Sequence, residues 1–263
     1  MIIEFETVAG LFGVAVVAGA VDAIAGGGGL MTLPALLLAG LDPVSAIATN
    51  KLQGSAGSVS ATIAFARRGL IRWREAGPAA LGAGLASVGG ALCVSLLPRS
   101  VLDALVPLML VGIALYFATA RRMSNEDAAA RITPGLFALT LAPAVGFYDG
   151  VFGPGAGSFY MIGFVTLLGL GVVRATAHTK LSNAASNLGS LALFTLQGAV
   201  IWPVGLAMAV GAFLGAQAGS ALAVRLGARL IRPLLVVIAC AMALRLLSNP
   251  ANPLRQAVAG FFS

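Results

Sequence analysis

Two lysines lie inside apolar stretches, each within a run of polar but uncharged side chains. Lys51 stands in TNKLQGS, residues 49–55, and Lys180 stands in HTKLSNAASN, residues 178–187. A charge that lies deep in a bilayer is costly unless it faces a cavity or a partner. Ammonium groups beside hydroxyl and amide groups are suited to hold a small anion, so the pattern predicts a binding site for one.

The polar residues around the two lysines are the candidate contacts of that anion. We expect it to contact Asn50, Lys51, Gln53 and Ser55 from the first run and Thr179, Lys180, Asn183 and Asn187 from the second. In a helix, residues 179, 183 and 187 share one face because they are four positions apart. Such a face can also hold membrane helices together, since Ser, Thr and Asn hydrogen-bond between helices. The sequence leaves this alternative open for any one of them.

Two glycine-rich stretches, 26–29 and 153–157, each follow an apolar segment and precede a short one. Glycine here predicts the end of one helix and the start of another, whose exposed N–H groups attract anions. The alternative is close packing of helices through small residues. The phosphate-loop pattern GxxxxGK[ST] is absent. The predicted site therefore also includes Gly27, Gly28, Gly155 and Gly157.

Asp22, Asp149 and His178 are candidates for coupling transport to protons, since each can change charge. Each lysine could instead form a buried ion pair with Asp22 or Asp149, which is compatible with anion binding if the pair opens when the anion arrives. A single histidine is also commonly an interior hydrogen-bonding residue. The sequence has no cluster with metal-ligand spacing and no GxSxG motif, so we predict no enzyme, no metal and no cofactor.

The composition defines the surroundings of these residues. Of the 263 residues, 59 % are hydrophobic and 10 % are charged, and the mean hydropathy is +0.98. Soluble domains carry about 25 % charged residues, so too little polar surface is present to cover a globule in water. We predict an all-α, multi-pass protein of the bacterial inner membrane, with the lipid bilayer as a partner. The net charge of +7 fits cytoplasmic loops better than nucleic-acid binding.

Ten hydrophobic segments are recognisable, and a polar linker at 122–132, which we expect to be cytoplasmic, divides them five and five. They span residues 7–25, 28–41, 43–66, 76–97, 100–120, 133–152, 156–170, 172–196, 200–222 and 229–248. A helix needs about 20 apolar residues to cross a bilayer. Segments 28–41 and 156–170 are shorter, so the sequence does not decide whether they cross fully.

The two halves, 1–121 and 133–263, match at a constant offset of 129 residues, the difference between 180 and 51. At that offset Lys51, Phe65, Trp73 and Gly26 pair with Lys180, Phe194, Trp202 and Gly155. Loop 67–74 is basic whereas its counterpart 197–203 is not, and 225–232 is basic. The positive-inside rule then places equivalent loops on opposite sides. We predict two inverted repeats of five helical elements, an arrangement that places binding sites near the midplane of transporters.

The stretches from Gly19 to Ser58 and from Gly146 to Ser190 resemble the paired signatures of the TauE/SafE family of sulfite exporter-like permeases. In both, an aspartate precedes a glycine-rich stretch, a short helix and a lysine-leucine pair. The resemblance implies transport of anions such as sulfite, sulfonates or other sulfur-containing organic acids. It places Lys51, Lys180 and the two glycine stretches at the family's matching positions. His178 departs from a strict repeat of Asn50 and Lys51.

These observations together predict a secondary transporter, an exporter, that moves small anions by alternating access around a site between the repeats. An anion channel, or an uptake permease for another small organic acid, would use the same donors. The glycine-rich faces permit a homodimer. The sequence identifies neither the anion nor the direction of transport nor the coupling ion.

Overall fold

The computed structural model describes residues 4–94, 124–227, 229, 230, 233 and 237. Within these ranges the chain is helical and contains no strand, which confirms the predicted all-α class. The first half holds α1 (Phe5–Ala25), α2 (Gly28–Leu38), α3 (Pro43–Ala66) and α4 (Trp73–Cys93). The second holds α6 (Pro134–Leu139), α7 (Leu141–Val151), α8 (Ala156–Thr166), α9 (Val172–Leu196) and α10 (Trp202–Leu226). The predicted segment 100–120 and most of 229–248 lie outside the described residues.

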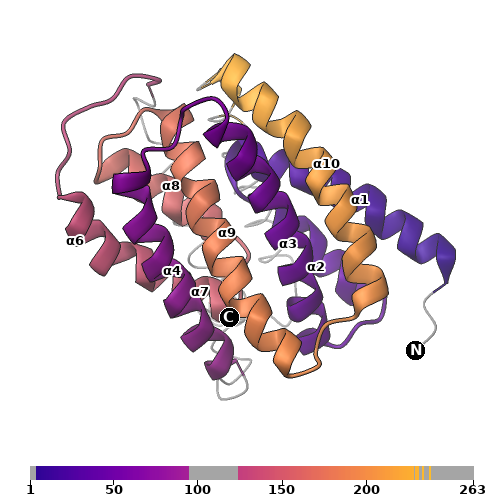
Figure 1. Ribbon diagram of the computed structural model, residues 1–263. Coiled ribbons are helices and arrows are strands. Elements are labelled where there is room, and N and C mark those ends of the chain that lie inside the picture. Colours follow the sequence, from indigo (N-terminus) through magenta and orange to yellow (C-terminus); the bar gives the residue numbers. More distant parts are fainter. Residues whose placement is uncertain (1–3, 95–123, 228, 231–232, 234–236, 238–263) are drawn as a thin grey trace, which may run out of the picture.

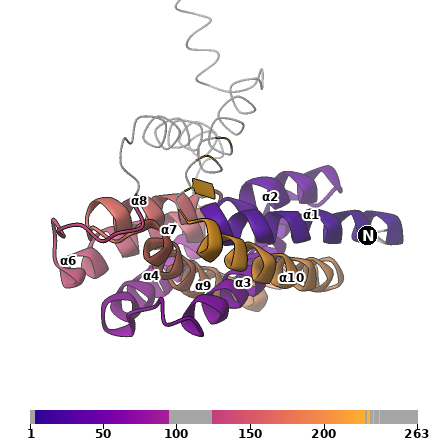
Figure 2. The ribbon, with the colours of Figure 1, turned by 90° about the horizontal axis from the view of Figure 1, so that it is seen from above.

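Four long helices form one layer in the order α4, α9, α3, α10 (Figure 1). Helix α1 packs along α10, and α7 packs along α4. The short helices α2 and α8 pack against α3 and α9 on one face of this layer, as the view from above shows (Figure 2). Helices α3 and α9, which carry the two lysines, therefore run side by side through the centre of the molecule.

The two short helices are too short to cross a bilayer as helices. Each has 11 residues, which corresponds to a length of about 16 Å, whereas the hydrocarbon core is about 30 Å thick. Helices α1, α4 and α10 are long and apolar enough to cross a membrane. Helices α3 and α9 have 24 and 25 residues, but they bury polar faces toward each other and toward the short helices.

The predicted helix over 133–152 is wrong in one respect, because the chain breaks into α6 and α7 at Thr140, where φ is −119° and ψ is −80°. Pro143 explains the break. Proline lacks an N–H, and its ring clashes with the carbonyl of the residue four positions earlier, which here is Leu139. Other ends move by a few residues: α4 begins at Trp73, and α2 and α8 end at Leu38 and Thr166.

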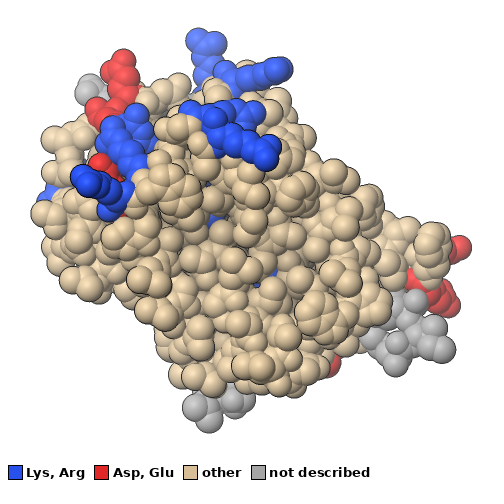
Figure 3. Space-filling model, viewed as in Figure 1, with Lys and Arg blue, Asp and Glu red and all other residues tan. Residues whose placement is uncertain are grey.

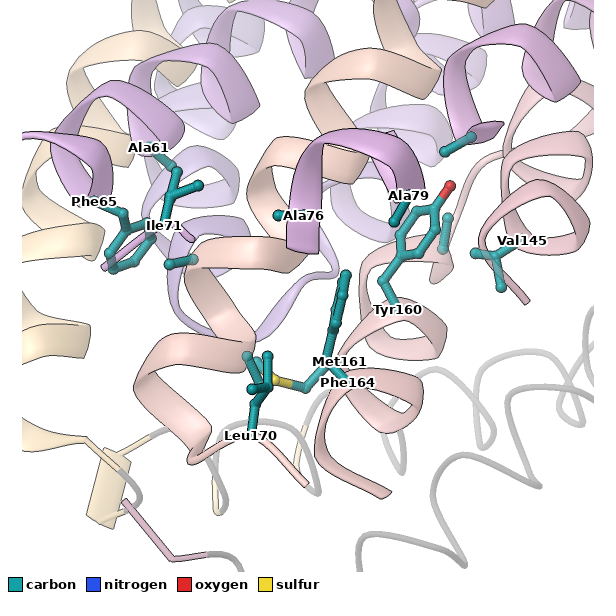
Figure 4. Close-up of a cluster of buried hydrophobic side chains, with 14 of the residues drawn as sticks. Ala61, Phe65, Ile71, Ala76, Ala79, Val145, Tyr160, Met161, Phe164 and Leu170 are labelled. Atoms are coloured by element: carbon teal, nitrogen blue, oxygen red, sulfur yellow. The ribbon is translucent and has the colours of Figure 1, made fainter. Parts of the chain in front are cut away.

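Small residues let the outer helices approach the layer closely. A Cβ on Gly19 of α1 would lie 2.8 Å from the Cα of Ala212 in α10, and one on Gly146 of α7 would lie 2.6 Å from the Cα of Ala83 in α4. Larger aromatic side chains fill the space where α8 meets α4, α7 and α9, including Tyr160 (Figure 4). The α1–α10 and α7–α4 pairs are therefore packed in the same way, with a glycine of one helix against an alanine of the other.

Basic side chains gather at one end of the molecule, over the α3–α4 loop and the end of α10 (Figure 3). The linker reaches this end as well: Asp127 forms ion pairs with Arg72, at 3.4 Å, and with Arg174. Its carboxylate also accepts a hydrogen bond of 2.8 Å from the N–H of Gly171. The loops predicted to share the cytoplasmic side therefore lie together.

Candidate functional site

Two buried ion pairs lie at the centre of the molecule, and each joins the two halves of the chain. Lys51 Nζ of α3 lies 2.7 Å from Asp149 Oδ1 of α7, and Lys180 Nζ of α9 lies 2.9 Å from Asp22 Oδ2 of α1. Each lysine is thus paired with the aspartate of the opposite half. The ion-pair alternative that the sequence left open is present in the structure for both lysines.

The first pair is enclosed almost completely. The side chains of Lys51 and Asp149 are 1 % and 3 % exposed. Lys51 also donates to the backbone carbonyl of Asp149, and the hydroxyl of Ser186 in α9 donates to Asp149 Oδ2. Gly153, at φ +95°, lets the chain pass over this pair, since a Cβ there would lie 2.8 Å from Lys51 Nζ. A buried charge requires such partners, because water is not there to solvate it.

The second pair has a different set of donors. Asp22 Oδ1 accepts hydrogen bonds from the N–H groups of Gly27 and Gly28, at 3.0 and 3.1 Å. These are the first N–H groups of α2, where the helix dipole favours a negative charge. Lys180 is 0 % exposed, whereas the side chain of Asp22 is 20 % exposed. The N–H groups that the sequence predicted to attract an anion thus hold a carboxylate of the chain itself.

A small polar cavity of about 40 Å³ lies between the two pairs. That space is sufficient for a few water molecules or one small ion, since one water needs about 10–15 Å³ on this measure. Most of its wall is glycine backbone from both halves, together with amide side chains. The predicted residues that line it are Gly27, Gly28, Asn50, Lys51, Gln53, Gly155, Gly157, Asn183 and Asn187, with Asp22 and Asp149 of the coupling candidates.

Some predicted residues lie apart from this cavity. Lys180 reaches it only through Asp22, and neither Ser55 nor Thr179 is among the lining residues. The hydroxyl oxygens of Ser55 and Thr179 are buried and have no hydrogen-bond partner among the described residues. The side-chain oxygen of Asn183 is also buried without a partner there, and it does line the cavity. An unpaired buried polar atom at a cavity is a candidate contact for a ligand.

The structure places His178, in α9, against the residue that precedes α4. Its Nε2 accepts a hydrogen bond of 3.1 Å from the N–H of Arg72, and its ring contacts that of Phe164 edge-on at 5.4 Å. Its counterpart in the first half, Thr49, accepts a hydrogen bond of 3.0 Å from the N–H of Ile201, just before α10. The two bonds correspond to each other at the offset of 129 residues, because His178 matches Thr49 and Ile201 matches Arg72, so His178 and Thr49 are equivalent anchors. A role of His178 in coupling stays a prediction.

Sequence reasoning missed Thr32, whose hydroxyl lies 2.5 Å from Asn50 Oδ1. Ser186, which binds Asp149, lies in the polar run around Lys180 but was not singled out as an anion contact. Thr32 is a polar residue in the otherwise apolar α2, and that isolation was an available signal. Of the other lining residues, Gly29, Gly153 and Ala156 lie within the two predicted glycine-rich stretches, whereas Gly19, Gly54 and Gly57 were not predicted.

A helical core with paired charges around a polar cavity, covered by apolar helices, defines a membrane protein of the transporter class. The sequence agrees with this class, because the model of the family described as sulfite exporter TauE/SafE matches residues 11–246. The chain belongs to this family.

Curated relatives cover nearly the whole chain. A protein of Sinorhizobium sp., named "Probable membrane transporter protein ORF9", is 52 % identical over 96 % of this chain and 97 % of its own. "Probable membrane transporter protein YfcA" of Escherichia coli strain K12 is 48 % identical over 90 % of this chain and 88 % of its own. A "Probable membrane transporter protein" of Haemophilus influenzae is 40 % identical over 92 % and 95 %. No solved structure matches the chain significantly.

Proposed function

We propose that this protein is a multi-pass secondary transporter of the bacterial inner membrane that exports small anions, with sulfite, sulfonates and other sulfur-containing organic acids as the substrate class. The observation that carries the proposal is the cavity between two lysine–aspartate pairs. It combines ammonium groups, backbone N–H groups at helix starts and amide side chains. These are the donors that bind an oxyanion in a space from which bulk water is excluded.

Alternating access would follow from movement of the two halves, which we take to be inverted repeats. Helices α3 and α4 begin at Pro43 and Trp73, and α9 and α10 begin 129 residues later, at Val172 and Trp202. Contacts between the halves are also reciprocal: α1 packs on α10 as α7 packs on α4. A site at the centre of such a pair becomes open to one side and then to the other when the repeats rock.

Binding is the first test. Purified protein would be heated with sulfite, sulfate, thiosulfate, sulfoacetate, taurine, chloride and carboxylates, and the shift in melting temperature would be measured. We expect a selective increase with a sulfur oxyanion. Asn183→Ala removes an amide from the cavity and should reduce the shift. Gln217→Ala removes an amide that binds Ser60 outside the cavity and should leave the shift unchanged.

Transport in liposomes separates the alternatives. A secondary transporter gives flux that saturates and is stimulated by anion on the opposite side, whereas an anion channel gives neither. Flux driven only inward in oriented vesicles would favour an uptake permease. If no anion changes the melting temperature and none crosses the membrane, the proposed function is wrong.

A further inference from the structure

We propose that the Asp22 carboxylate occupies the place of the substrate's anionic group, and that the substrate displaces it as Asp22 takes up one proton. Each bound anion would then be accompanied by one proton from the adjoining water. The inference rests on the proposed function, since it assumes that this cavity binds an anion. It adds the mode of binding and the means of coupling.

The geometry around Asp22 is that of an occupied oxyanion site. One carboxylate oxygen accepts from the N–H groups of Gly27 and Gly28, and the other contacts the ammonium group of Lys180 at 2.9 Å. These three donors come from α2 and α9, while the anion that they hold comes from α1. None of the donors would have to change for a sulfonate, sulfite or carboxylate group to take the same place.

Asp22 is the carboxylate that can leave. Its side chain is 20 % exposed and lines the cavity, whereas that of Asp149 is 3 % exposed. Asp149 is fixed by two side-chain donors, Lys51 and Ser186. The side chain of Asp22 lies directly against Gly28, because a Cβ built on Gly28 would lie 2.8 Å from the Cβ of Asp22. Rotation of one side chain away from Gly27 and Gly28 would open the site without moving a helix.

The charge balance requires a compensating proton. Lys51, Lys180, Asp22 and Asp149 sum to zero, so a bound anion would leave one uncompensated negative charge in a poorly solvated space. Protonation of Asp22 restores neutrality and also removes the carboxylate's attraction to Lys180. When Asp22 moves away, it leaves free the donors that would then bind the anion.

The other charged or titratable groups on the elements packed against α1 are few within the described residues. Helix α3 carries Lys51, and α9 carries Arg174 and His178 besides Lys180. The remaining ones are Tyr160 on α8 and Arg225 in the last turn of α10. Apart from Lys180 these groups number five, and among them only Lys51 lines the cavity. It is already neutralised by Asp149, so it does not compensate the arriving charge.

The experiment is a binding titration at several pH values. Methanesulfonate and ethanesulfonate are suitable probes because each keeps a single negative charge between about pH 5 and 8. We expect Kd to rise about tenfold per pH unit where Asp22 is ionised in the free protein. Calorimetry in two buffers of different ionisation enthalpy should give one proton taken up per anion. Both measurements use the unaltered protein, so neither depends on a variant that folds.

Asp22→Asn should bind either probe with no pH dependence and more tightly than the parent at pH 8. Asp42→Asn is the matched control, because Asp42 is an exposed carboxylate at the start of α3, and it should keep the parental slope. Asp22→Glu restores a carboxylate and should restore the slope.

Four results would overturn the inference. Binding of the probes without proton uptake in the parent would refute the displacement while leaving the proposed function intact. A parental slope that persists in Asp22→Asn would assign the proton to another group. If neither probe binds although another anion does, the substrate's anionic group is not of the assigned class; if no anion binds, the proposed function fails as well.

Discussion

The two lysine–aspartate pairs use the same chemistry in different surroundings. Asp149 is held by side chains, those of Lys51 and Ser186, and is 3 % exposed. Asp22 is held by the backbone of a helix start and by Lys180, and is 20 % exposed. Both pairs cross between the halves of the chain. In the mechanism proposed above, the first pair holds the halves together, whereas the second exchanges its anion.

The largest effect is expected where the first pair is broken. Asp149→Ala would leave Lys51 charged, buried and unpaired, and loss of one partner of a buried pair costs about 3–5 kcal/mol. Asp22→Ala should cost less, since water can enter beside Lys180 where Asp22 is now exposed. Denaturant unfolding of both variants in the same detergent measures the difference. Equal losses would show that the two pairs are not distinct in stability.

Replacing both members of the first pair sharpens the distinction between structure and transport. In Lys51→Met with Asp149→Leu no charge remains unpaired, and such replacements of buried pairs are often neutral or stabilising by about 1–4 kcal/mol. We expect the double variant to recover the stability that Asp149→Ala loses, yet to transport no anion. The readouts are unfolding and liposome flux. A stable double variant with parental flux would show that Lys51 and Asp149 serve stability alone and are not needed for transport.

The sequence predicted the elements and most of the cavity, because both follow from local patterns. Glycine stretches marked the starts of α2 and α8, and polar spacing marked the inner faces of α3 and α9. The break at Thr140 was also encoded, through Pro143. All of these depend on residues a few positions apart.

Partner choice could not be read in the same way. Nothing local determines that Lys51 meets Asp149, 98 residues away, instead of Asp22, because that contact depends on how the halves dock. The contact of Asp22 with the first N–H groups of α2 could not be predicted either, because it requires the backbone to turn at Gly26, where φ is +70°. The titratable side chain of His178 suggested a role in proton coupling, whereas its observed contact is with the backbone N–H of Arg72, just before α4.

A smaller effect is expected at the two equivalent anchors. His178→Ala would leave the N–H of Arg72 without its acceptor, and Thr49→Ala would do the same for Ile201. An unsatisfied donor costs about 1–3 kcal/mol when it is buried. The loss should lie at the lower end of this range, because Arg72 is exposed and Ile201 is half-buried. His178→Gln offers an oxygen acceptor and should recover part of the loss. The measurement is thermal unfolding of the three variants beside the parent.

The same variants test coupling. If His178 is an anchor only, the pH dependence of anion binding in His178→Gln should follow that of the parent. A flattened pH profile in a variant that remains folded would instead support the predicted role of His178 in coupling. Thr49→Ala is the matched control, because it removes an equivalent anchor that cannot titrate.

The smallest effect is expected at the starts of α3 and α9, which are capped by different means. Asp42 caps α3 and accepts from the N–H groups of Val44 and Ser45, each at 3.1 Å. Helix α9 is instead preceded by Gly171, whose N–H donates to Asp127 of the linker. Hydrogen bonds from Ser45 hold the pKa of Asp42 below its usual range. Asp42→Ala should cost about 1 kcal/mol at neutral pH.

The pH dependence of that loss identifies its origin. Because the folded-state pKa of Asp42 is lowered, its contribution is complete above the unfolded-state pKa and is lost as the pH falls through the folded-state pKa. The difference in unfolding temperature between parent and Asp42→Ala should therefore shrink below about pH 4. Asp42→Asn keeps an acceptor without the charge, so its stability relative to Asp42→Ala should not change with pH. A gap between parent and Asp42→Ala that stays constant down to acid pH would mean that the cap acts through its hydrogen bonds alone, as an uncharged acceptor would.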